Sequence, residues 1–69
     1  MKYFIVFFKC TNSLGSMYGN TGFIRDKALP SQHEMRDYIA KECEAKIGQV
    51  NITNVTKVDK DDYESFFSE

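Results

Sequence analysis

The stretch from Tyr3 to Phe8 constrains the fold of this chain more than any other, because six apolar residues, four of them aromatic, stand between two lysines. A short run rich in aromatic and β-branched residues is typical of a strand. Side chains alternate along a strand, so Tyr3, Ile5 and Phe7 face one side and the residues between them face the other. Both faces of this strand are apolar, and we predict that both are covered.

The length of the chain, 69 residues, leaves room for one domain. A chain of this size buries only about 60 % of its unfolded surface, so disulfides, metals or oligomers often supply the missing stability. Apolar residues make up 42 % and charged residues 28 % of the sequence, which is ordinary for a globular protein and disfavours disorder. We therefore predict a single small α+β domain over residues 1–69.

Turn and cap signals divide the chain into five elements. Strands are predicted over residues 2–10, 17–25 and 50–58, a helix over 32–47 and a short helix over 59–69. Small polar residues around Gly15 predict the first turn, over 11–16, and Gly19-Asn20 is an alternative turn. Gly19 and Gly22 weaken the second strand and indicate a bulge or an edge position.

The predicted long helix has signals at both ends. Ser31 and Glu34 match a capping box at its start. Gly48 stands where a left-handed residue would end a helix. Between these signals, apolar residues recur at helical spacing and predict the buried face: Met35, Tyr38, Ile39, Cys43 and Ile47.

The third strand changes side-chain parity part-way along. Val50 and Ile52 share one face, whereas Val55 falls on the other. Either a bulge near Asn54 resets the register, or both faces of this strand are partly buried. In the short helix that follows, Asp59 is the predicted N-cap.

The order of the elements limits the sheet topology. The first two strands form a hairpin, and the helix returns the chain so that the third strand pairs with the first. We predict a three-stranded antiparallel sheet in the order 2-1-3, with a right-handed crossover that lays the long helix on one face. The fold class is therefore α+β, ββαβ(α), and the sequence does not decide which face the helix covers.

One long helix leaves the aromatic residues of the second face without cover, and an apolar patch above about 300–600 Å² is unusual on a soluble monomer. Three covers are possible for this face: the short C-terminal helix, a second copy of the chain packed sheet on sheet or edge on edge, or another protein or nucleic acid. The short helix is expected to cover only part, so a homodimer is the leading prediction. The residues predicted for this partner or dimer surface are Tyr3, Phe7, Tyr18, Phe23, Tyr63, Phe66 and Phe67.

Charge is unevenly distributed along the chain. The net charge of −1 disfavours strong non-specific nucleic-acid binding, but residues 1–58 carry +3 and residues 59–69 carry −4. The acidic end is interpreted as a solvated helix face, and a decoy for a cationic site is the alternative. Exposed sheet aromatics keep single-stranded nucleic-acid binding as a further alternative. The cations that would meet phosphates near the hairpin are Lys2, Lys9, Arg25 and Lys27.

Residues with catalytic or metal-binding chemistry are few. Cys10 and Cys43 are interpreted as reduced thiols, and His33 as an exposed residue in the first helical turn. Cys43 lies ten residues along the predicted helix from His33, about 15 Å by rise, so the two cannot form a nucleophile–base pair. We predict no enzyme activity, no metal, no cofactor and no membrane-spanning segment.

In overall style the chain is similar to small uncharacterised proteins carried by phages and prophages. The resemblance implies no catalytic residue. It implies a cytoplasmic accessory protein that acts by binding an unknown protein partner. If the protein comes from a phage, the cytoplasm is that of the host. The segments that carry it are Lys2-Tyr3-Phe4-Ile5-Val6, Gly19-Asn20-Thr21-Gly22-Phe23, Pro30-Ser31, Ile52-Thr53-Asn54-Val55 and Asp61-Asp62-Tyr63-Glu64.

Overall fold

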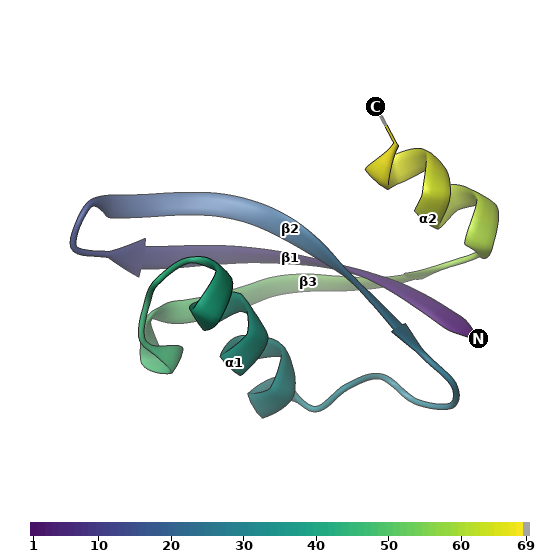
Figure 1. Ribbon diagram of the computed structural model, residues 1–69, viewed down its shortest axis with the longest axis horizontal. Helices are drawn as coiled ribbons and strands as arrows, with labels where there is room; N and C mark the ends of the chain where they lie inside the picture. Colours follow the sequence, from purple (N-terminus) through teal and green to yellow (C-terminus); the bar gives the residue numbers. More distant parts are fainter. Residues whose placement is uncertain (69) are drawn as a thin grey trace.

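The computed structural model describes residues 1–68, and Glu69, the last acidic residue, lies outside the described residues. The three strands form one antiparallel sheet in the order β2-β1-β3, and a helix lies on each side of it (Figure 1). This confirms the predicted α+β fold and strand order. The elements are β1 (Lys2–Asn12), β2 (Gly15–Arg25), α1 (Gln32–Glu42), a short 3₁₀ turn η1 (Ile47–Gln49), β3 (Val50–Val58) and α2 (Lys60–Phe67).

The hairpin between β1 and β2 turns over only two residues, which is tighter than the predicted turn over 11–16. The side chain of Asn12 accepts a hydrogen bond from the Leu14 amide at 2.8 Å, and Gly15 has a φ of 127° that disfavours other residue types. Both strands therefore continue almost to the tip. Gly19 and Asn20 lie inside β2, so the alternative turn is wrong.

A bulge interrupts β3, which is one of the two alternatives that the sequence left open. Phe7 lies opposite Asn54 and Phe8 opposite Ile52, so Thr53 is the extra residue. The Thr53 hydroxyl donates a hydrogen bond to the Phe7 carbonyl at 3.1 Å. Because the bulge resets the side-chain parity, Ile52 and Val55 both pack against the same core.

The core lies between the sheet and α1, on the face that carries the even-numbered residues of β1. The residues of α1 buried against it are Met35, Ile39 and Ala40, and Val50 closes the core from β3. The buried residues of the hairpin on this face are Phe4, Val6, Phe8, Cys10 and Phe23.

The predicted helix over 32–47 is too long, because α1 ends at Glu42. Its start at Ser31 follows the prediction, with the Ser31 hydroxyl accepting from the Glu34 amide at 3.1 Å. The capping box is only half formed, because the Glu34 carboxylate pairs with Arg25. At its end Glu44 adopts a left-handed φ of 54°, and the Ala45 amide donates to the Ala40 carbonyl at 2.9 Å, as in a Schellman motif. Gly48 is therefore not the terminating residue.

Candidate functional site

The predicted aromatic surface is largely occupied by the chain's own C-terminal helix. Tyr3 and Phe7 of β1 lie on the second face of the sheet, and α2 places its three aromatic residues over them. The ring centroids of Tyr3 and Tyr63 are 5.3 Å apart, and those of Phe7 and Phe66 are 6.0 Å apart. Phe67 joins the cluster through Tyr63 and Phe66, at 4.9 and 5.0 Å.

A glycine in β2 makes room for this helix. A Cβ atom added at Gly22 would overlap the Tyr63 hydroxyl oxygen and lie 2.6 Å from the Tyr63 ring. Tyr63 therefore lies directly on the backbone of β2, beside Ile5, which is opposite Gly22 in the sheet and is buried. Asp59 caps the helix by accepting from the Asp62 amide at 2.8 Å, as predicted.

Two of the predicted surface residues lie apart from this cluster. Phe23 is on the other face, buried in the core with its ring centroid 5.3 Å from that of Tyr38, so it is not a surface residue. Tyr18 is 75 % exposed near the hairpin tip, with the Lys9 ammonium 5.7 Å from its ring centroid. Five of the seven predicted residues thus come together in one cluster. Two of the five, Phe66 and Phe67 of α2, stay half-exposed.

The outer edge of β2 is a second exposed feature; the sequence allowed a second copy to pack edge on edge but did not say at which edge. No strand among residues 1–68 pairs with this edge. From Gly15 to Ile24 the strand carries no charged residue and no proline, and its register with β1 runs without interruption. Natural proteins usually block edge strands with charges, prolines, bulges or short length. The edge of β2 has none of these protections over ten residues.

The opposite edge of the sheet is protected. The bulge at Thr53 interrupts β3 near its middle, and Lys57 adds a charge close to its end. In addition, α1 packs closer to β3 than to β2. The sheet therefore has one edge that resists pairing and one that is open to it.

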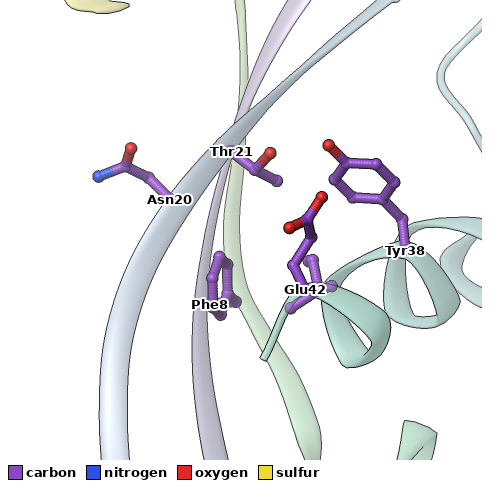
Figure 2. A pocket seen from close by; sticks show the side chains of 6 residues that line it. Phe8, Asn20, Thr21, Tyr38 and Glu42 are labelled. Atoms are coloured by element: carbon purple, nitrogen blue, oxygen red, sulfur yellow. The ribbon is translucent and has the colours of Figure 1, made fainter. Parts of the chain in front are cut away.

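A groove runs along the open edge, between β2 and α1 (Figure 2). It has a volume of about 290 Å³ and a floor made by two buried side chains, Phe8 and Ile39. Thr21 from β2 and Tyr38 and Glu42 from α1 place their polar ends above this floor. The groove joins an apolar base to hydrogen-bonding groups, as sites for partner side chains do.

The Phe8 ring reaches the groove because β2 has a glycine beneath it. A Cβ atom added at Gly19, which lies opposite Phe8, would come within 2.8 Å of the ring. A cross-strand aromatic ring of this kind covers the exposed backbone of an edge glycine. Gly19 and Gly22 thus support aromatic rings on the two faces of β2, and the predicted edge position of this strand is confirmed.

The thiols and the histidine lie apart from this groove. Cys10 is buried and Cys43 half-buried, and both are free. Burial, together with a hydrogen bond to Cys10, raises the pKa of the Cys43 thiol, which disfavours the reactive thiolate. His33 is exposed in the first turn of α1. Across residues 1–68, no three His, Cys, Asp or Glu side chains gather where they could hold a metal ion.

The cations expected to meet phosphates are partly engaged. Arg25 forms an ion pair with Glu34 and lies 5.4 Å from the Phe23 ring centroid. Lys9 lies over Tyr18, so two of the four cations contact the protein itself. The acidic side chains of α2 are exposed, and the ion pairs in the described part of the chain, Arg25–Glu34 and Lys41–Asp37, do not involve them.

Comparison of the chain with protein-family models, curated proteins and solved structures found no match. The resemblance to small phage proteins stays a prediction that depends on the sequence segments alone. Within residues 1–68, none of the helices combines the length and apolar character needed to cross a bilayer. The candidate site is therefore defined by its geometry, an open strand edge beside an apolar groove.

Proposed function

We propose that this chain is a non-enzymatic, intracellular accessory protein that works through protein–protein contacts, and that it does so as a homodimer joined along β2. One observation carries the proposal: the edge of β2 has ten consecutive residues without charge, proline or bulge, whereas the edge of β3 is interrupted. A strand added at such an edge gains a row of main-chain hydrogen bonds.

The dimer surface in this proposal differs from the one the sequence suggested. The aromatic face was expected to need a second chain, but α2 already buries Ile5 and half-covers Tyr3 and Phe7. What stays unpaired is backbone at the edge. A second copy supplies a suitable strand, because its own β2 is equally free of charge and no like charges oppose each other along residues 15–24.

Light scattering during gel filtration tests the proposal with a matched pair of variants. Asn20 and Asn54 are both exposed and both lie opposite Phe7, one on each edge of the sheet. Asn20→Lys places a charge on each strand of the proposed seam, so we expect it to dissociate the dimer. Asn54→Lys is the control and should leave the mass at twice the 8.0 kDa of one copy.

Two outcomes would count against the proposal. A wild-type chain that stays at 8.0 kDa up to high concentration has no dimer to explain. Equal effects of the two lysine variants would mean that β2 is not the seam. Titration with short single-stranded DNA at low salt tests the competing nucleic-acid function, and salt-sensitive binding there would favour that alternative.

A further inference from the structure

Symmetry restricts how two β2 strands can pair. In an antiparallel pair related by a two-fold axis, residues opposite each other lie on the same face of the sheet. The axis therefore passes between the two copies of one residue of β2, and each choice of that residue gives a different set of opposed side chains. The groove beside β2 lies on the α1 face, so the side chains on that face distinguish the choices.

Met17 is the apolar residue of β2 that its own chain leaves free on the α1 face. It is 45 % exposed, whereas Phe23 on the same face is buried in the core. Arg25 is paired with α1, and the strand's other residues on this face are Gly15, Gly19 and Thr21. On the β2 strand of a second copy, Met17 is therefore the one exposed apolar side chain that could fill the groove and contact its apolar floor.

We infer, on the basis of the proposed dimer, that Met17 of each copy inserts into the groove of the other copy. This requires Met17 to lie opposite Thr21, which lines the groove, and it places the two-fold axis at Gly19. The thioether then meets the rings of Phe8 and Tyr38. Methionine suits such a site, because its flexible side chain fills irregular gaps and its sulfur contacts aromatic rings favourably.

This register pairs nine of the ten uncharged residues of the edge. Residues 15–23 of the two copies pair with each other, and Arg25 lies beyond the paired segment in both. At the axis two Gly19 residues face each other, each with a Phe8 ring over it. The two rings flank the axis and close the space that the absent glycine side chains would leave.

The neighbouring register, with the axis at Asn20, fits the structure less well. It aligns Met17 with Phe23, whose ring is already buried against Tyr38. The groove then receives no apolar side chain. The register with the axis at Asn20 also extends the pairing to Arg25, so that a charged residue enters the seam opposite Gly15.

Disulfide trapping separates the registers. With the axis at Gly19, Tyr18 of one copy lies opposite Asn20 of the other, within the Cα separation that a disulfide spans. In a Cys43→Ser background, where the remaining Cys10 is buried, mild oxidation should link chains only when Tyr18→Cys and Asn20→Cys variants are mixed. Asn20→Cys linking to itself would place the axis at Asn20 and overturn the inference, and Tyr18→Cys linking to itself would do the same.

A pair of truncations measures the contribution of the inserted side chain. Met17→Ala should raise the dimer Kd about tenfold or more, since each dimer loses two inserted side chains. Leu14→Ala is the matched control, because Leu14 is 95 % exposed in the turn and lies outside the paired segment. Equal Kd values for Met17→Ala and the wild type would overturn the inference.

The failure of this inference is distinguishable from the failure of the proposed function. A dimer that is confirmed by light scattering, depends on Asn20, and shows no Tyr18–Asn20 link rejects the register and leaves the β2 seam in place. A chain that is monomeric in every measurement rejects the dimer itself.

Discussion

The two faces of the sheet are closed in different ways. On the α1 face, aliphatic and aromatic side chains of all three strands and the helix form a buried core. On the α2 face, one strand residue, Ile5, is fully covered, and the helix above it has no buried residue of its own. The α1 face is covered by a buried hydrophobic core, whereas the α2 face is covered by a helix that contacts it mainly through half-exposed aromatic rings.

This difference bears on where the proposed partner would bind. The sequence shows more apolar strand surface than one helix can cover, which suggests a missing partner on the second face. The structure assigns α2 to that face and leaves the edge of β2 unpaired. An incomplete sheet, rather than an uncovered face, is therefore the feature that a partner would complete.

The comparison of the faces would fail if a core residue of α1 proved no more important than an aromatic of α2. Ile39 is 1 % exposed, and Ile39→Ala should lower the free energy of unfolding by about 2–5 kcal/mol. Phe66 is 44 % exposed, and Phe66→Ala should cost about 1 kcal/mol, because much of its ring is already in water. Urea unfolding of the two variants gives both values, and similar losses would contradict the comparison.

The contact between Tyr63 and the backbone of β2 offers a sharper test of how α2 packs on the second face. Gly22→Ala forces the Tyr63 ring away from the strand, so we expect a loss of about 1–3 kcal/mol and altered ring signals of Tyr63 by NMR. Gly48→Ala is the control, since no atom lies within 4 Å of a Cβ built there. An unchanged Tyr63 environment in Gly22→Ala would show that α2 does not rest on β2.

The end of α1 carries a strain that a single substitution should relieve. Glu44 has a φ of 54°, which glycine adopts without steric cost. Glu44→Gly should raise the free energy of unfolding by about 1 kcal/mol, offset in part by the greater freedom of glycine in the unfolded chain. A destabilised variant in thermal unfolding would argue that the left-handed turn at Glu44 is wrong.

The smallest expected effect concerns the thiol at the end of the α1 core. Burial and the hydrogen bond to Cys10 raise the pKa of Cys43 in the folded state. The folded chain therefore holds this proton more tightly than the unfolded chain, and the associated stability is present at neutral pH and declines as the pH rises above about 8.5. The drop in urea midpoint between pH 7 and pH 10 should be smaller in Cys43→Ser than in the wild type.

Much of the fold could be predicted because local signals agree with one another. Ser31 and Asp59 cap their helices as expected, and the bulge in the third strand was one of two interpretations of its parity change. The end of α1 was missed because Gly48 resembles a terminating residue, whereas Glu44 gives no such signal. The turn at Asn12 was drawn too wide because its length depends on one side-chain hydrogen bond.

The candidate site was only half predictable. Alternation along β1 correctly grouped Tyr3 and Phe7 on one face, but it could not assign the faces to the two helices. Phe23 was placed on the surface because its face depends on the pairing register, which the exact turn sets. The sequence does contain a sign of the open edge, because no residue from Gly15 to Ile24 is charged. This absence of charge can be interpreted only once β2 is known to be an edge strand.

Hydrogen exchange of the backbone amides tests the central claim, that the unpaired edge of β2 is where this protein binds a second copy. Alternate amides of β2 point away from β1, and no strand among residues 1–68 of the same copy pairs with them. We predict that they are protected at high protein concentration and exchange quickly on dilution, while the outward amides of β3 do not change. Outward β2 amides that exchange quickly at every concentration would contradict the account.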